Sequence, residues 1–389
     1  MSMLRRVLLY ALFSTTVCAQ SSLSLAGAGY QSPTPIQAAP GQVLTVFLTG
    51  AQTVLPVLSG IRGQWASGAP LPTTLAGFSA SLTQNIPALS KQLPLFSVMQ
   101  TDICSDQTAS SPDCMLTSLT LQLPSDMAVP NPGSAQPVPQ ITQLVIAENG
   151  RTSETFLVVP VQEKSHIVTS CDTVLRNPTA TCTPAITHAD GTPVSASAPA
   201  KVGEILVMYV LGMGSTSPLV PEGQATPTPA PTVTTQFSIG FDYVNPLPLL
   251  PSATVPADAA PALPFLFVGL TPGQIGLYQV NFVVQPPGFS ALSCPQQINP
   301  TNVTVALVHG ASPTASDAAK ICINTLGTSS AAAAAQTMAP SMSSASPFTP
   351  STVWFPVGSN LSFLGQPLPP QSVGVPGPVP PSLSPGAGH

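Results

Sequence analysis

A chain of 389 residues with 6% charged and 43% hydrophobic residues is neither a charge-rich disordered chain nor a charged coiled coil. Its length exceeds a single comfortable hydrophobic core, which favours two compact units with additional segments. Its 48 prolines are spread so widely that few proline-free windows of helical length remain, so the sequence argues against long helices and favours short strands and turns.

The N-terminus has the pattern of a secretory signal peptide. Arg5 and Arg6 precede a short apolar stretch, residues 7–17, which is followed by Cys18 and Ala19. We therefore expect a signal peptide over residues 1–19, cleaved after Ala19. The apolar stretch is too short to span a bilayer, and no later run reaches the roughly 18 residues that a membrane helix needs. The expected product is secreted, with no membrane span.

Cleavage also changes the charge balance. It removes two of the nine basic residues and leaves all fourteen acidic ones. Binding to phosphates depends on clustered Lys and Arg, and the remaining basic residues are scattered. The sequence therefore argues against a nucleic-acid partner.

An internal repeat indicates two related lobes. The segment APGQVLTVFLTGAQTVLP, residues 39–56, matches the character of KVGEILVMYVLGMGSTSP, residues 201–218, with Gly41 over Gly203 and Gly50 over Gly212. Short apolar runs bounded by Gly and Pro are typical of buried sandwich strands. We expect a first β-sandwich lobe over residues 20–162 and a second over residues 163–326.

Further strand patterns follow in both lobes. In the first lobe they cover residues 77–82, 93–99, 116–124 and 141–161, and in the second residues 235–243, 263–270, 277–286 and 302–310. Asn149-Gly150 accepts the two positive φ angles of a type I′ turn, so its flanks should form a hairpin. Repeated short strands predict an all-β fold, with two immunoglobulin-like sandwiches in tandem.

The most patterned stretch is GLTPGQIGLYQVNFVV, residues 269–284. A phosphate-binding loop is unsupported, because no Lys-Ser/Thr partner is present and the run enters a strand instead of a helix. Pro272-Gly273 suits the centre of a type II turn, and Gly276 suits a bulge or a close contact. The stretch is predicted to be a corner between strands.

The composition changes near residue 327, where Ala, Ser and Pro dominate. Residues 327–389 have too little sustained apolar pattern to offset the entropy of ordering them. We expect a low-complexity, disordered or extended tail.

Six cysteines remain after processing, which predicts three disulfides in an oxidising compartment. Six cysteines allow fifteen pairings, and neighbours along the chain meet most readily. The neighbouring pairs are Cys104 with Cys114, Cys171 with Cys182, and Cys294 with Cys322. No Cys/His cluster has the spacing of a zinc site.

The segment at residues 269–286, together with VGEILVMYVLGMGSTSP at residues 202–218, resembles the Solibacter-type uncharacterised C-terminal domain found on secreted acidobacterial proteins. In that family a TGLG strand end precedes a GLAPGFVGLYQVN corner. The resemblance covers roughly residues 24–325 and is more specific in the second lobe. It implies an extracellular β-sandwich with no catalytic or metal residues to carry over. The chain departs from the pattern by its cysteines, a Pro-rich insert at residues 244–264, and its tail.

Catalytic signatures are not evident in the sequence. None of the four histidines falls in a catalytic motif, and Ser215 in GMGSTSP lacks the G-x-S-x-G elbow, so a strand end is the favoured interpretation. We expect no enzyme activity and no cofactor. The alternative left open is a secreted hydrolase or a calcium-dependent carbohydrate-binding protein without a recognisable motif.

Two groups of polar residues lie near cysteine pairs. Asp102, Asp106 and Asp113 surround the first pair and offer oxygen ligands for calcium, although a solvated loop is favoured because no EF-hand motif is present. The second pair is flanked by a group that is predicted to lie on surface loops: His166, Asp172, His188 and Asp190. No metal site is predicted in either group.

Ligand binding by loops at the ends of the sandwich is the favoured kind of function, in adhesion, recognition or scaffolding. The partner would be an extracellular protein or a glycan. Trp65, taken as a loop residue, and Tyr243 are the candidate ligand-binding aromatics, whereas Tyr209 and Tyr278 lie on strands and are expected in the core.

Overall fold

The computed structural model describes residues 23–28, 35–58, 61–104, 112–130, 141–172, 182–243, 265–287, 293–294, 301–309 and 315–325. Within these ranges the chain forms β-strands and contains no α-helix; a 3₁₀ turn, η1 (Pro112–Cys114), precedes β10. The all-β prediction is confirmed for this part of the chain. The predicted signal peptide, the Pro-rich insert and residues 327–389 lie outside it.

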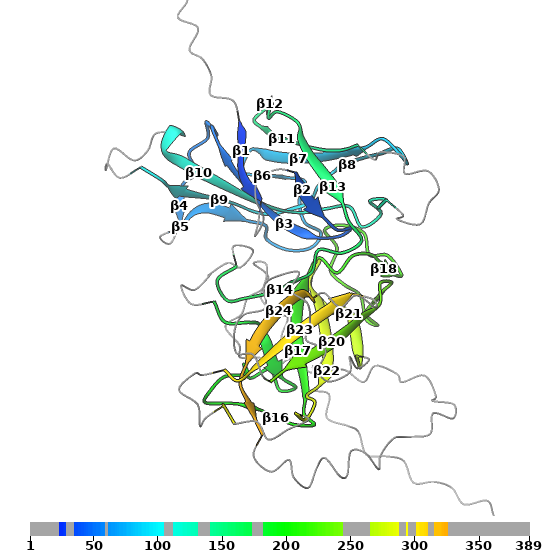
Figure 1. The fold of residues 1–389 in the computed structure, drawn as a ribbon. Helices are drawn as coiled ribbons and strands as arrows, with labels where there is room; N and C mark the ends of the chain where they lie inside the picture. The colour runs from blue at the N-terminus through cyan, green and yellow to red at the C-terminus, as the bar shows by residue number, and fades with distance from the viewer. Residues whose placement is uncertain are drawn as a thin grey trace, which may run out of the picture.

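The first lobe is built from two sheets that enclose one hydrophobic core (Figure 1). One sheet has the strand order β1-β3-β10-β9-β5-β4. Its strands are β1 (Ser24–Ala28), β3 (Val43–Thr49), β10 (Met115–Gln122), β9 (Leu95–Asp102), β5 (Ile61–Trp65) and β4 (Val57–Leu58). The other sheet has the order β2-β13-β11-β7-β6, with β12 beside β11 and β8 beside β7. Its strands are β2 (Ile36–Ala38), β13 (Phe156–Pro160), β11 (Thr142–Glu148), β7 (Phe78–Gln84), β6 (Thr74–Leu75), β12 (Arg151–Thr152) and β8 (Leu89–Gln92).

The second lobe repeats this arrangement. Its larger sheet has the order β14-β17-β22-β21-β19-β18, with β15 beside β17. Its strands are β14 (His166–Ile167), β17 (Ile205–Leu211), β22 (Tyr278–Val283), β21 (Phe267–Leu270), β19 (Thr232–Val233), β18 (Thr216–Ser217) and β15 (Ile186–His188). A three-stranded sheet, β20-β23-β24, and the pair β16-β25 complete the lobe. These strands are β20 (Phe237–Asp242), β23 (Val303–His309), β24 (Ala315–Ile321), β16 (Ala200–Lys201) and β25 (Ile323–Asn324).

The alternation of side chains explains why these segments form sandwich strands. Phe78, Ala80 and Leu82 of β7 are buried, while the residues between them are partly exposed. Because successive side chains of a strand point to opposite faces, every second residue enters the core. The strands of the second lobe are buried on both faces over longer stretches, as in the run of buried residues in β23.

The repeat seen in the sequence is a repeat of structure. Strands β3 and β17 are the two copies, and the glycines at corresponding positions all have positive φ angles, between 71° and 82°. Both lobes also contain a parallel pair, in which a short strand ahead of the repeat lies along the last strand of the lobe: β2 with β13, and β16 with β25. All other strand pairs described are antiparallel.

The predicted hairpin at Asn149-Gly150 is confirmed. These residues have φ angles of 47° and 85°, and Glu148 pairs with Arg151 across the turn. Glu148 is 1% exposed, and its carboxylate accepts hydrogen bonds from the backbone N–H groups of Gln52 and Thr53 and from the Arg151 guanidinium. The hairpin is thereby attached to the loop that follows β3.

Candidate binding groove between the lobes

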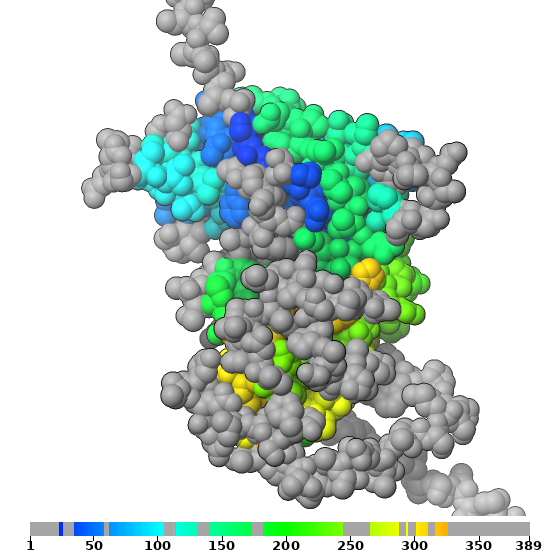
Figure 2. Space-filling view, in the orientation of Figure 1, coloured from blue at the N-terminus to red at the C-terminus, as the bar shows by residue number. Residues whose placement is uncertain are grey.

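The two lobes share a hydrophobic interface and lie one above the other (Figures 1 and 2). Four buried side chains of the first lobe pack against seven from the second lobe. The cluster consists of Val43, Ala66, Leu71, Phe96, Val168, Ala185, Val207, Tyr209, Leu211, Ile275 and Leu277. Strands β3, β9 and β17 contribute to it, so the six-stranded sheet of the first lobe packs against the seven-stranded sheet of the second lobe through this cluster.

The stretch at residues 269–284 is the corner that the sequence predicts. Gly273 has a φ of 74°, and the N–H of Gln274 donates to the carbonyl of Thr271 at 3.1 Å, which closes a turn around Pro272-Gly273. The prediction of a close contact at Gly276 is also confirmed. A Cβ atom at Gly276 would lie 2.6 Å from Val43 Cγ2, so the close contact is with the other lobe.

Polar contacts at the interface accompany this core. The N–H of Gly223 donates to Gln122 Oε1 at 2.8 Å, and the N–H of Leu71 donates to the Gly223 carbonyl at 2.9 Å. The Glu222 carboxylate accepts from the Ser125 N–H at 2.8 Å and pairs with Lys91 Nζ at 2.9 Å. The two lobes are therefore held together by a hydrophobic cluster, by hydrogen bonds and by an ion pair, and this interface is called the joint below.

A groove of about 450 Å³ lies beside this joint. Its lining comes from the segment after β10, the connection between the lobes, and the ends of second-lobe strands. The lining residues are Met127, Val129, Gln162, Ser215, Thr234, Thr235, Gln236 and His309. Only His309 among them has a titratable side chain, so the wall is polar and nearly free of fixed charge.

The walls of the groove are held by backbone contacts. The Tyr278 hydroxyl donates to the Gly214 carbonyl, and the N–H and hydroxyl of Thr234 both donate to the Ser215 carbonyl, at 2.9 and 3.1 Å. A Cβ at Gly214 would lie 2.1 Å from the Gln162 carbonyl oxygen. Gln162 therefore lies directly against the strand end that carries Ser215.

His309 stands next to a carboxylate at one end of the groove. Its Nδ1 atom is 3.7 Å from Glu163 Oε1, and its ring centroid is 5.7 Å from that of Phe237. Glu163 accepts hydrogen bonds from the Ser165 hydroxyl at 2.6 Å and from the Ser316 hydroxyl at 3.0 Å. These hydroxyls are therefore directed at the carboxylate and not at the imidazole.

A second histidine is clamped between two carboxylates. His166 Nε2 is 2.9 Å from Asp172 Oδ2, and its Nδ1 is 3.2 Å from Asp317 Oδ2. Burial by itself would lower the pKa of His166, but the hydrogen bonds to Asp172 and Asp317 outweigh burial and raise the pKa to about 9. Burial would likewise raise the pKa of Asp172, but the hydrogen bond and charge of His166 lower it. These ion pairs, called the charged clamp below, connect β14 to β24 and to the start of the loop between Cys171 and Cys182.

The surface-loop prediction for this group is therefore wrong for His166, whose side chain is 17% exposed. His188 is also largely covered, and its Nδ1 lies 2.6 Å from Glu204 Oε1, whereas Asp190 is exposed and accepts a hydrogen bond from the Thr192 N–H. Burial would lower the pKa of His188, but the bond to Glu204 outweighs it and raises the pKa. Sequence spacing missed these clusters because Asp317 is 151 positions from His166.

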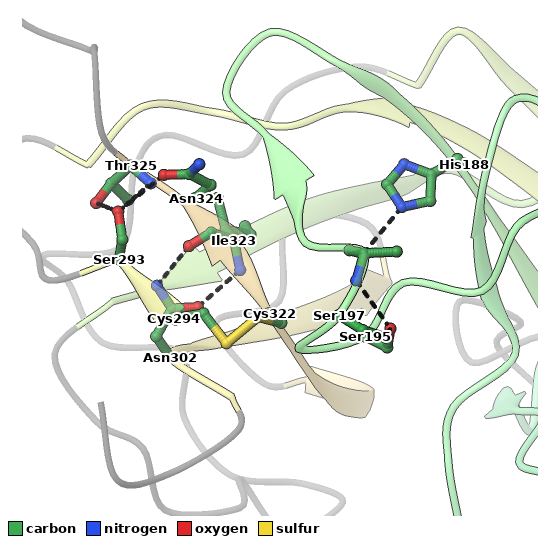
Figure 3. The surroundings of a disulfide bond; sticks show 11 residues. His188, Ser195, Ser197, Ser293, Cys294, Asn302, Cys322, Ile323, Asn324 and Thr325 are labelled. Carbon is green, nitrogen blue, oxygen red and sulfur yellow. Dashed lines mark hydrogen bonds between the residues drawn. A yellow bond between two sulfur atoms is a disulfide. The ribbon is translucent and has the colours of Figure 1, made fainter. Parts of the chain in front are cut away.

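Three disulfides join the neighbouring cysteines, with Cα–Cα distances of 5.2 Å for Cys104–Cys114, 4.8 Å for Cys171–Cys182 and 5.3 Å for Cys294–Cys322. They indicate an oxidising, extracytoplasmic environment. Figure 3 shows the third bond, whose two cysteines are each 1% exposed. Beside it the Asn302 side chain donates to the Ile323 carbonyl at 2.9 Å and accepts from the Ile323 N–H at 2.8 Å, which anchors β25 (Figure 3).

The aspartates of the first cysteine loop are only partly described. Asp102 Oδ1 accepts a hydrogen bond from the Cys104 N–H at 3.0 Å, while Asp106 lies outside the described residues. Over the part of the chain that the structure describes, no group of three or more His, Cys, Asp or Glu side chains could hold a metal ion. No described helix is long and apolar enough to cross a membrane.

The candidate aromatics lie away from the groove. Trp65 is not a loop residue: it ends strand β5, pairs with Ser97 across the sheet, and is half-buried. Tyr243 is also half-buried and packs against the second core, where its hydroxyl donates to the Gln285 carbonyl. The core predictions for Tyr209 and Tyr278 are confirmed, since both are buried. Sequence reasoning missed the groove because its lining is drawn from five separate segments.

No protein-family model matches the chain, and a search of curated proteins gave no match either. The resemblance to the Solibacter-type domain therefore stays a prediction based on residues 202–218 and 269–286.

Proposed function

We propose that this protein is a secreted, non-catalytic recognition or scaffolding protein made of two immunoglobulin-like β-sandwich lobes. The strand order supports the fold. In each lobe the chain crosses back and forth between the sheets in groups of one to three consecutive strands, and the last strand lies parallel to a short early strand, as expected for an immunoglobulin-like sandwich. The suggested relation to the Solibacter-type family points the same way.

Secretion is supported by two independent features. Residues 1–19 have the pattern of a signal peptide, and the three disulfides suit an oxidising compartment. Both features support a partner outside the cytoplasm, and neither identifies it.

The observation that carries the recognition role is the groove. It lies beside the packed interface between the lobes, and most of its lining residues have uncharged polar side chains. A rigid, concave and polar surface can hold a ligand through hydrogen bonds without a further conformational change. The proposed role is therefore to hold an extracellular glycan or protein.

A binding screen tests this role. The mature protein, residues 20–389, is applied to immobilised glycans and to cell-envelope components, beside a Trp65→Ala variant. We expect saturable binding by the parent protein. Binding lost in Trp65→Ala would assign the β5 edge to the ligand, whereas equal binding would direct attention to the groove. A parent protein that binds nothing in the screen would contradict the recognition role and leave only passive scaffolding.

A second candidate function is a secreted hydrolase, favoured by one observation. Ser215 and His309 line the same groove, and Glu163 lies 3.7 Å from His309. A serine nucleophile needs a hydrogen bond to its base, and among the described residues no such bond joins Ser215 to His309. Labelling by a fluorophosphonate probe that disappears in Ser215→Ala would favour the hydrolase; no labelling of the parent protein would remove it.

A further inference from the structure

The groove between the lobes has a chemistry that narrows the kind of ligand. Hydroxyl groups come from Ser215, Thr234 and Thr235, and side-chain amides from Gln162 and Gln236. The Ser215 and Thr235 hydroxyls can each donate and accept, the Thr234 hydroxyl already donates to the Ser215 carbonyl, and each amide presents both a donor group and an acceptor atom. The wall therefore suits a ligand that carries hydrogen-bond donors and acceptors on neighbouring atoms.

Charge argues against an ionic ligand. The lining contains no Lys, Arg, Asp or Glu, and the whole chain has a formal charge of −5. A charged group placed in the groove would lose part of its hydration without gaining an ion-pair partner, apart from His309. The long-range field of an acidic protein also disfavours anions. The fitting ligand is uncharged.

Shape and apolar contacts separate a sugar from a peptide. An extended peptide usually binds by adding to a sheet edge through its main chain, whereas the groove presents mainly side-chain hydroxyls and amides. Met127 and Val129 add an apolar area to the polar wall. Such a combination matches a pyranose ring, which has hydroxyls around its rim and C–H groups on its faces. The volume of about 450 Å³ falls within the range of small-ligand sites, roughly 300–1,000 Å³.

We infer that this groove binds a neutral oligosaccharide, with Gln162, Ser215, Thr235 and Gln236 contacting its hydroxyls and the half-buried Val129 contacting a ring face. The inference rests on the proposed recognition function and gives it a site and a ligand class. Met127 is 3% exposed and belongs to the hydrophobic core of the first lobe, and its backbone N–H donates to the Pro124 carbonyl at 3.3 Å. This part of the groove wall is therefore backed by a packed core.

The test uses the full mature chain and a set of neutral hexasaccharides: cellohexaose, mannohexaose, xylohexaose, laminarihexaose and chitohexaose. Binding is followed by isothermal titration calorimetry and by saturation-transfer NMR. We expect at least one sugar to bind with a dissociation constant of about 1 mM or tighter. Thr235→Trp, which fills the groove, should weaken that binding at least about tenfold.

A matched variant controls for the added tryptophan. Thr74 is exposed on β6 of the first lobe and does not line the groove, so Thr74→Trp should bind as the parent does. Gln236→Ala removes one amide without adding bulk and should weaken binding by about three- to tenfold. It provides a second measurement if Thr235→Trp has a lowered melting temperature.

The outcomes distinguish the groove from the wider role. A hexasaccharide that binds equally to the parent, Thr235→Trp and Gln236→Ala would overturn the groove inference and retain the recognition function. Absence of hexasaccharide binding, together with capture of an envelope protein or a charged glycan in the wider screen, would do the same. Absence of any ligand in both experiments would contradict the inference and the recognition function together.

Discussion

Replacing Gly276 by alanine should weaken the joint between the lobes. Gly276 has a φ of 65°, and an added Cβ would lie 2.6 Å from Val43 Cγ2 and 3.0 Å from Gln122 Nε2. Val43 is β-branched and 1% exposed, so it has little freedom to move away. The Gly276→Ala variant should lose about 1–2 kcal/mol of unfolding free energy because alanine disfavours the left-handed backbone conformation. It should lose a further amount of about 1–3 kcal/mol because the added methyl group overpacks the interface.

Gly273→Ala is the matched control. Its φ is 74°, close to that of Gly276, but nothing lies within 4 Å of its added Cβ. Gly273→Ala should therefore lose only the unfolding free energy that comes from placing alanine at a positive φ angle. The difference between the two variants measures the contact with the first lobe, because the backbone term is nearly common to both.

The assay is urea unfolding of the parent and both variants, followed by tryptophan fluorescence and circular dichroism. A double variant, Gly276→Ala with Val43→Ala, removes the clashing methyl group and should lose less than the sum of the two single changes. Equal midpoints for Gly276→Ala and Gly273→Ala, or strictly additive losses in the double variant, would refute the packing of this corner against the first lobe.

Three further predictions concern the charged clamp, the disulfides and the buried carboxylate. Because the pKa of His166 in the folded protein is raised from 6.5 to about 9, the stabilisation from its ion pairs is complete below pH 6.5 and is lost as pH rises through about 9. Urea unfolding at a series of pH values should show this decline for the parent and not for His166→Gln, and parallel curves would contradict it. Mild reduction without denaturant should open Cys171–Cys182 before Cys294–Cys322, since Cys182 is exposed while both cysteines of the latter pair are buried; alkylation and mass mapping give the order, and the reverse order would refute the argument. Glu148→Gln should lower the unfolding free energy by about 1–3 kcal/mol, because the amide keeps one oxygen acceptor where the carboxylate has two, and its NH2 group cannot accept a hydrogen bond from Gln52, Thr53 or Arg151. The surface change Glu154→Gln serves as its control in thermal unfolding, and equal losses would contradict a special role for Glu148.

Much of the local structure was readable from the sequence because it depends on short-range chemistry. Asn149 and Gly150 are residue types that tolerate positive φ angles, and Pro272 and Gly273 are the residue types that favour the two central positions of a type II turn. Alternating or continuous apolar runs bounded by Gly and Pro correctly predicted strands at β7, β11, β17 and β22. The pairing of cysteines by proximity along the chain also agrees with the three disulfides.

The site depended on contacts that no local pattern contains. The groove is lined by residues between positions 127 and 309, and the interface core joins Val43 to Ile275 and Leu277. Gly276 was recognisable as a place of close contact, but only the fold shows that Val43 of the other lobe is the neighbour. His166 had the appearance of a surface residue because its second carboxylate, Asp317, comes from a strand near the end of the second lobe.

The amino-acid sequence alone determined the strand-rich architecture, the repeat of two lobes and the positions of the tight turns, since these follow from backbone preferences and the periodicity of neighbouring residues. Only the tertiary structure decided which faces meet, which ionisable groups form a buried cluster, and where a concave polar surface lies. Such features depend on side chains far apart in the chain, and packing brings them together through the sum of many weak contacts that no short segment specifies.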